Sequence, residues 1–165
     1  MPRSPRPKRG PGVGTTKRGK DTKLLVVVDG EGVPLGGHFH TASPAEVTLA
    51  EADLASVQIP RPRDRPRTKP DRLIADKAYD SDALRRRLRG RGIDVIVPHR
   101  RNRRRPPVHD GRKLRRYRRR WIVERTIAWI GNFRRLLVRW EGRLTMYAAF
   151  LHVAFIMLAL RRVTL

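Results

Sequence analysis

Short apolar runs alternate along this chain with basic stretches that are rich in proline or glycine. The first pair of runs lies in TKLLVVVDGEGVPLGGHFHTA, residues 22–42, where two segments rich in residues that favour strands flank Asp29-Gly30, with Gly32 close behind. This pattern predicts a β-hairpin, and Asp29 is interpreted as a turn residue.

A helix is expected to follow the hairpin, from Ser43 to about Val57. Ser43 is a suitable N-cap, Pro44 suits the first helical position, and Glu46 completes the pattern of a capping box. Residues 59–70, IPRPRDRPRTKP, hold four prolines and five basic residues, which predicts an irregular surface loop.

The next three segments read as strand, helix and strand. DRLIAD (71–76) and IDVIVP (93–98) are short apolar runs, and SDALRRRLRGRG (81–92) has a helix-start pattern and ends in glycines. A helix between two strands makes a βαβ unit, so these strands are expected to be parallel.

The C-terminal third is dominated by helical patterns. Apolar residues between positions 121 and 140 recur at helical spacings, and LTMYAAFLHVAFIMLAL (144–160) is a 17-residue, almost wholly apolar run. A buried helix is favoured for this run over a membrane span, because the run is slightly short and contains Thr145 and His152. The predicted order β-β-α-β-α-β-α-α indicates an α/β fold with a mixed sheet and flanking helices.

The charge of the chain is strongly positive. It has 39 Lys and Arg against 15 Asp and Glu, a formal net charge of +24. Such a charge is typical of proteins that bind a polyanion, with nucleic acid as the first candidate and an anionic membrane surface as the second. The chain has no cysteine, which excludes disulfides and thiolate metal sites and fits a cytoplasmic protein.

Three acids stand close together in LIADKAYDSDALRRRL, residues 73–88. Asp76 follows a predicted buried strand, at the sheet edge where ligands and catalytic groups gather in α/β folds, so it is either a turn residue or part of an active site. Asp80 and Asp82 lie at the predicted start of the helix, and both are interpreted as capping or dipole-complementing acids.

Glu124 interrupts an apolar run. Tyr117, Arg120 and Glu124 are spaced to share one face of a helix, where Arg120 and Glu124 could simply form a surface ion pair. Alternatively, Asp76 and Glu124 together provide the oxygen ligands that Mg²⁺ prefers, in a site for phosphodiester chemistry.

A second group of metal-binding side chains is incomplete. His38 and His40 lie on one face of a predicted strand and could bind Zn²⁺, but no third ligand is near them in the sequence.

Three motifs together resemble the C-terminal part of bacterial insertion-sequence transposases of the DDE type, in the insertion-sequence-five-like group. They are LIADKAYDSDALRRRL, IVPHRRNRR and YRRRWIVERTIAWIGNFRRLLVRWE, and the resemblance covers the chain from about residue 12 to the end. It implies an RNase H-like mixed sheet with flanking helices, a Mg²⁺ site (Mn²⁺ as an alternative), Asp76 as the second catalytic aspartate and Glu124 as the catalytic glutamate. The lysine of the helix motif falls on Gly131, where Arg134 or Arg135 could substitute.

The family's first catalytic aspartate would lie on a strand upstream of the hairpin. The fold is therefore expected to be incomplete at the N-terminal strand, with an unpaired sheet edge and little or no cleavage activity in the isolated chain. The expected organisation is a basic flexible arm at 1–20 and a truncated catalytic domain at 21–165, with the 59–70 loop and an Arg-rich loop at 98–116.

The resemblance implies Mg²⁺-dependent phosphodiester hydrolysis and strand transfer in DNA transposition. Expected partners are the DNA of element ends and targets, further copies of the chain on that DNA, and a segment from an upstream reading frame; no membrane is expected, and the location is the nucleoid-associated cytoplasm. The alternative is a non-catalytic basic nucleic-acid-binding protein. The residues expected to contact DNA are Arg100, Arg101, Arg103, Arg104, Arg105, Tyr117 and Arg120.

Overall fold

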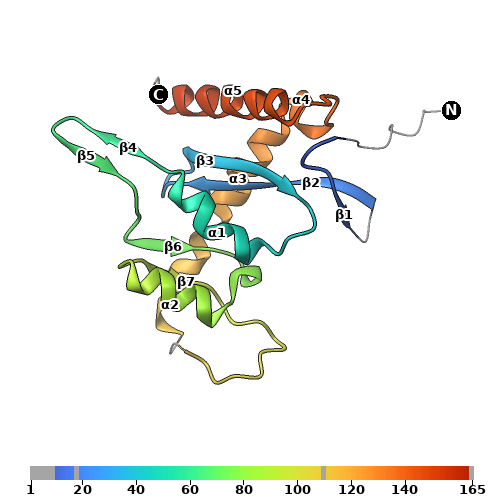
Figure 1. The fold of residues 1–165 in the computed structure, drawn as a ribbon. Coiled ribbons are helices and arrows are strands. Elements are labelled where there is room, and N and C mark those ends of the chain that lie inside the picture. The colour runs from blue at the N-terminus through green and yellow to red at the C-terminus, as the bar shows by residue number, and fades with distance from the viewer. Residues whose placement is uncertain (1–9, 17–18, 109–110, 164–165) are drawn as a thin grey trace.

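The computed structural model describes residues 10–16, 19–108 and 111–163, which form three small sheets and five α-helices (Figure 1). The first sheet is antiparallel, in the order β1 (Gly14–Thr16), β2 (Gly19–Val28) and β3 (Pro34–Thr41). β1 and the start of β2 lie within the range 1–20 that was expected to be a flexible arm, so that expectation is corrected for residues 14–16 and 19–20. Residues 1–9 and 17–18 lie outside the described part.

The predicted hairpin is confirmed by the pairing of β2 with β3. Asp29 Oδ1 accepts backbone N–H bonds from Glu31, Gly32 and Val33 at 2.8 to 2.9 Å, and Gly32 has a φ of +94°, which favours glycine. Asp29 is therefore a turn residue, with one carboxylate oxygen bound to three backbone N–H groups of the turn.

Helix α1 (Glu46–Ala55) begins later than predicted. Its N-cap is Ala45, which makes no side-chain cap bond, and Thr48 Oγ1 donates to the Ala45 carbonyl at 2.7 Å. The expected cap at Ser43 is wrong because the chain at this point is tied to β2 instead: Lys23 Nζ donates to the Pro44 carbonyl at 2.8 Å.

The segment expected to be an irregular loop forms a small exposed hairpin of β4 (Ile59–Arg61) and β5 (Asp64–Arg67). Prolines are tolerated here because each strand of a two-stranded ribbon is an edge strand, with one side that needs no ladder bond. The predicted exposure of this segment is retained, but its predicted lack of regular structure is corrected.

The predicted βαβ unit is confirmed. β6 (Arg72–Ile74) pairs in parallel with β7 (Asp94–Ile96), and the 3₁₀ turn η1 (Lys77–Tyr79) and helix α2 (Asp82–Gly90) connect them. Ser81 caps α2 by accepting the Leu84 N–H. The apolar face of α2 is buried in a cluster of Ala50, Leu54, Leu84, Leu88 and Ile93.

The predicted single mixed sheet is not formed among the described residues, because β2 pairs only with β1 and β3, and β6 pairs only with β7. The two sheets are nevertheless neighbours: Val27 of β2 and Leu73 of β6 pack against the same buried cluster. The observed architecture is therefore α/β with a divided sheet, in which β2 and β6 each have an edge without a strand partner over most of their length.

The predicted helix after the Arg-rich loop is divided into three parts. A 3₁₀ segment η2 (Arg112–Arg120) leads into α3 (Trp121–Gly131), and the short α4 (Arg134–Leu137) follows. Fully buried Thr126 of α3 donates to the Gly32 carbonyl at 2.8 Å, which fixes α3 against the hairpin turn.

Helix α5 (Leu144–Val163) packs one face on the first sheet and leaves the other exposed (Figure 1). On the buried face, Phe155 packs on Gly37, where a Cβ would lie only 2.9 Å from its ring. The exposed apolar residues of α5 are Met146, Val153, Ile156, Met157 and Leu160. The prediction of a buried helix thus holds for one face only. By length and composition alone, Leu144–Arg162 is long and apolar enough to cross a membrane.

Candidate active site

Asp76 lies where β6 ends and η1 begins. Its backbone is extended and occupies the N-cap position of η1, but its carboxylate makes no capping bond. The carboxylate instead faces the end of η2, where it accepts a bond from Arg120 Nη1 at 2.8 Å. The backbone of Asp76 takes part in the turn, because its carbonyl accepts the Tyr79 N–H at 2.9 Å, while its carboxylate pairs with Arg120.

The guanidinium of Arg120 joins Asp76 to Glu124. Its Nη1 binds Asp76 Oδ2 at 2.8 Å, and its Nη2 binds Glu124 Oε1 at 2.6 Å. The carboxylates come from positions 48 residues apart in the chain, and both are partly open to solvent, with side chains 41% and 54% exposed. The surface ion pair considered for Arg120 and Glu124 is present, and it is also part of a three-residue cluster.

Tyr117 completes this cluster. The Arg120 guanidinium lies 5.6 Å from the centre of the Tyr117 ring. Burial raises the pKa of Tyr117, the Arg120 charge lowers it, and the Asp76 and Glu124 carboxylates raise it, with a net upward shift. The phenol therefore keeps its proton and can act as a hydrogen-bond donor beside the two acids.

The donor set fits a hard divalent cation. Mg²⁺ prefers oxygen ligands and is usually held by one or two carboxylates, with water and phosphate oxygens completing its coordination. Asp76 and Glu124 converge on one cationic group, so the space between them already favours positive charge. In the part of the chain that the structure describes, no third acid joins this pair.

Asp80 has a different role from the helix-capping one expected. Its carboxylate is 2% exposed and accepts bonds from Arg85 Nη2, His99 Nδ1 and the Arg100 backbone N–H at 2.9 to 3.0 Å. Burial alone would raise the pKa of Asp80, but these hydrogen bonds lower it below its ordinary value. Asp80 thus anchors the start of the Arg-rich loop, and the cap is Ser81.

Asp82 lies in the first turn of α2, as expected for an acid that complements the helix dipole. It also binds Arg103 Nη2 at 2.9 Å and lies 3.6 Å from Arg105 Nη1. Hydrogen bonding from Arg103 lowers the pKa of Asp82. Asp82 is therefore a second anchor for the Arg-rich loop.

These anchors divide the arginines of the loop into two groups. Arg100 donates to the carbonyls of residues 77 and 78, and Arg103 donates to Asp82 and to the carbonyls of residues 105 and 106, so both guanidiniums are bound to the chain itself. Arg101 and Arg104 are exposed and make no hydrogen bond or ion pair with the described residues, and the Arg105 side chain is 75% exposed. These last three are positioned to meet an external anion.

Gly131 has room for a side chain. A Cβ built on it would meet only a Leu137 methyl carbon at 3.8 Å, an ordinary contact. Of the two arginines considered as substitutes for a lysine here, Arg135 is engaged by Glu141 at 3.0 Å and by the Phe150 ring, whereas Arg134 is exposed.

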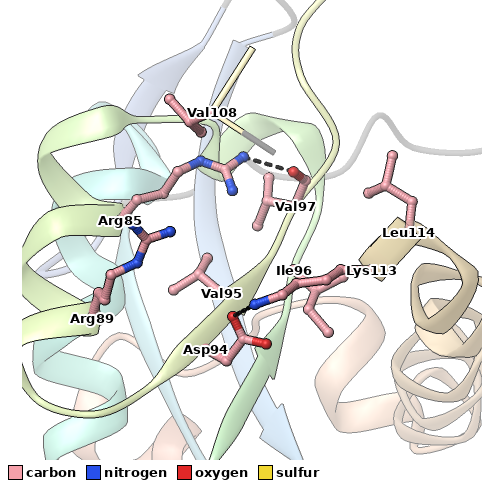
Figure 2. Close-up of a pocket in the computed structure, with 9 residues that line it drawn as sticks. All are labelled: Arg85, Arg89, Asp94, Val95, Ile96, Val97, Val108, Lys113 and Leu114. Atoms are coloured by element: carbon pink, nitrogen blue, oxygen red, sulfur yellow. Dashed lines mark hydrogen bonds and ion pairs between the residues drawn. The ribbon is translucent and has the colours of Figure 1, made fainter. Parts of the chain in front are cut away.

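A small pocket beside β7 is separate from this cluster (Figure 2). Figure 2 shows Arg85 and Arg89 on one side, Lys113 and Leu114 on the other, and the Lys113–Asp94 ion pair of 2.6 Å across its floor. Its volume of about 220 Å³ is below the usual range for small-molecule sites.

Comparison with known proteins identifies the family of this chain. The family model described as "Transposase DDE domain" matches residues 3–160. The chain belongs to the transposase DDE domain family. That family implies an RNase H-like fold, and the divided α/β sheet lacks the continuous central sheet of that fold. No solved structure matches the chain.

One relative shares much of this DDE domain. A protein of Burkholderia cepacia, named as a transposase for insertion sequence element IS402, is 38% identical over 147 residues. The match covers 88% of this chain and 65% of the relative, so the chain spans slightly less than two thirds of the relative's length.

Proposed function

We propose that this chain is the catalytic portion of a DNA transposase that performs metal-dependent phosphodiester hydrolysis and strand transfer. The observation that supports this function best is the convergence of Asp76 and Glu124 on the Arg120 guanidinium. The two acids come from distant segments, and this convergence brings two oxygen ligands together in a chain of formal charge +24. The insertion-sequence-five-like group is the subgroup we propose.

In this proposal, Asp76 and Glu124 hold Mg²⁺, with Mn²⁺ as a substitute. The bound ion would supply positive charge where negative charge develops on the phosphodiester oxygens. Arg120 neutralises the two acids in the structure described here, so cation binding would release its guanidinium to bind a DNA phosphate. Tyr117, with its proton retained, would donate a hydrogen bond to the same backbone.

We further propose that a third acidic ligand arrives on an additional strand between β2 and β6. Both strands have an edge without a strand partner among the described residues, and both pack on one cluster through Val27 and Leu73. A strand inserted there would join the two sheets into one and would end beside Asp76. The isolated chain is therefore expected to bind DNA but not to cleave it.

The proposed DNA contacts are phosphate contacts from the Arg-rich loop. Arg101, Arg104 and Arg105 are exposed, whereas Arg100 and Arg103 hold the loop in place. Each phosphate neutralised should add about 0.9 to the slope of log affinity against log salt. We also propose that several copies of the chain assemble on the DNA of element ends and targets. The proposed location is the nucleoid-associated cytoplasm.

The cation site can be tested in the isolated chain with Fe²⁺ in place of Mg²⁺. Fe²⁺ with ascorbate and peroxide cuts the backbone next to its ligands, so cuts are expected near residues 76 and 124, and Mg²⁺ should suppress them. Asp76→Asn and Glu124→Gln should abolish both cuts. Asp71→Asn is the matched control, because Asp71 lies next to the same strand but its side chain is 87% exposed and pairs only with Arg67. Unchanged cutting in Asp76→Asn would overturn the site.

A plasmid-nicking assay with Mg²⁺ or Mn²⁺ tests the activity. No nicking by the isolated chain is expected, and nicking should appear when the chain is produced together with a segment that supplies the additional strand. Nicking by the isolated chain that is lost in Asp76→Asn and Glu124→Gln would confirm transposase chemistry but refute the need for a third acid.

A non-catalytic nucleic-acid-binding protein is the second candidate, because Arg120 already satisfies both acids without a metal ion. In that case Fe²⁺ would produce no cuts near residues 76 and 124, and DNA binding would be unchanged in Asp76→Asn. The cation experiment therefore separates the two functions without depending on cleavage activity.

A further inference from the structure

Two histidines and a buried aspartate form a second cluster, away from Asp76 and Glu124. His38 and His40 are two positions apart on β3 and therefore face the same side of the sheet. Helix α1 packs on that side and directs Asp53 toward them. Asp53 Oδ1 lies 2.8 Å from His38 Nδ1 and 3.0 Å from His40 Nε2.

Asp53 is the unusual member of this cluster. It is 4% exposed, and a buried carboxylate is costly unless it is paired or binds a metal ion. Although the chain carries 39 Lys and Arg, the hydrogen-bonding and ion-pair partners of the Asp53 carboxylate among the described residues are these two imidazoles. Imidazole is a weaker source of positive charge than guanidinium, but a better metal ligand.

We propose that His38, His40 and Asp53 form a binding site for a divalent transition-metal ion, with Zn²⁺ as the best fit. One ligand atom from each residue can be chosen so that all three lie within 4.8 Å of one another. Ligand atoms on a tetrahedral Zn²⁺ lie about 3.3 Å apart, so the two separations from Asp53 Oδ1 to the imidazole nitrogens, 2.8 and 3.0 Å, need to widen by about half an ångström or less. Two imidazoles and one carboxylate are a ligand set that leaves a further position open.

The exposure of the three side chains is consistent with an accessible site. The His38 side chain is 47% exposed and that of His40 is 20% exposed, while Asp53 forms the buried floor. An ion can therefore enter from solvent past His38, and water can complete its coordination. A metal ion held here would link β3 to α1 at one point, in addition to the apolar contacts between them.

This site differs in chemistry from the proposed Mg²⁺ site. Mg²⁺ takes oxygen ligands, whereas imidazole nitrogen favours Zn²⁺ and its transition-metal neighbours. Burial raises the pKa of Tyr79, and the charges of Glu46, Asp53 and Asp76 raise it further, so carboxylates of both clusters act on this side chain. The inference does not depend on the proposed transposase function.

Titration of the full chain with Co²⁺, a coloured substitute for Zn²⁺, tests the proposal. One Co²⁺ per chain should bind with a visible absorption typical of low coordination number, Zn²⁺ should displace it, and millimolar Mg²⁺ should not. Zn²⁺ at a hundredfold excess over its Kd should raise the Tm by about 5 °C or more.

Three ligand variants, His38→Gln, His40→Gln and Asp53→Asn, should each lower Co²⁺ affinity at least tenfold and remove the Zn²⁺-dependent rise in Tm. His152→Gln is the matched control, because His152 is an exposed histidine on α5 far from the cluster in sequence. His38 is half-exposed, so His38→Gln should fold, and a normal urea midpoint without metal verifies this. Equal Co²⁺ affinity in the wild type and His38→Gln, or no visible absorption in the wild type, would overturn the proposal.

Discussion

Replacing Asp80 by asparagine should destabilise the protein strongly at neutral pH. The substitution keeps the shape of the side chain but removes a carboxylate that is 2% exposed and binds the Arg85 guanidinium at 3.0 Å. Arg85 is itself buried, with its side chain 7% exposed, and its Nε has no partner. Its bond to the Val97 carbonyl, of 2.6 Å, would remain as the main compensation for the lost charge.

The expected cost follows from this burial. Removing one partner of a buried ion pair costs about 3 to 5 kcal/mol, and the surviving carbonyl bond places Asp80→Asn near the lower limit, at about 3 kcal/mol. With an m-value of about 2 kcal/mol per molar urea, the midpoint of urea unfolding should fall by about 1.5 M. In Asp71→Asn, which breaks an exposed ion pair, the midpoint should move by no more than about 0.2 M.

The effect of Asp80 should depend on pH in one direction. Because the pKa of Asp80 is lower in the folded protein than its ordinary value of 3.8, its contribution to stability is present above that value and is lost as the pH falls through the folded pKa. The difference between wild type and Asp80→Asn should be largest at pH 5 to 7 and shrink below about pH 4. Equal urea midpoints at pH 7, or a difference that stays constant down to pH 3, would refute the buried ion-pair reasoning.

Four further substitutions test the candidate site and its surroundings. Arg101→Ala should lower the salt slope of DNA binding by about 0.9 without changing stability, as measured by mobility-shift titrations at several salt concentrations. Arg103→Ala should instead lower the midpoint of urea unfolding, because the Arg103 guanidinium is bound within the chain and that of Arg101 is not. Gly131→Lys should fold normally, because the added Cβ meets nothing closer than 3.8 Å, and a loss of folding would contradict the space assigned there. The same substitution should raise DNA affinity and steepen the salt slope of binding by up to about 0.9. Arg120→Ala should raise the affinity for Mn²⁺, measured by the EPR signal of the free ion, because a cation that competes for both carboxylates is removed; a lower affinity would show that Arg120 supports the site.

Local features were predictable where a few neighbouring residues decide the structure. Asp29-Gly30 predicted the hairpin turn, and the glycine-terminated run after Ser81 predicted α2, because turn and cap bonds involve residues within four positions of one another. The Ser43 cap failed for a non-local reason: Lys23, 21 residues away, binds the Pro44 carbonyl and holds the chain in another conformation.

The roles of the acids were less accessible from the sequence. Asp80 resembles a helix-start acid in sequence, but its partners include His99 and Arg100, about twenty residues later. Asp53 gave no sequence signal as a third metal ligand, because its proximity to His38 and His40 depends on the packing of α1 against β3. Spacing along the chain cannot reveal contacts that depend on how two elements pack.

The sequence by itself determined the kind of protein. The charge of +24 indicated a protein that binds nucleic acid, and the hydrophobic periodicities indicated an α/β fold. The three motifs singled out Asp76 and Glu124. Only the tertiary structure brought these two carboxylates onto one guanidinium, separated the anchoring arginines from the exposed ones, and divided the predicted sheet in two. The physical reason is that charge and periodicity are local properties of a chain, whereas a site and a continuous sheet depend on which distant segments pack together.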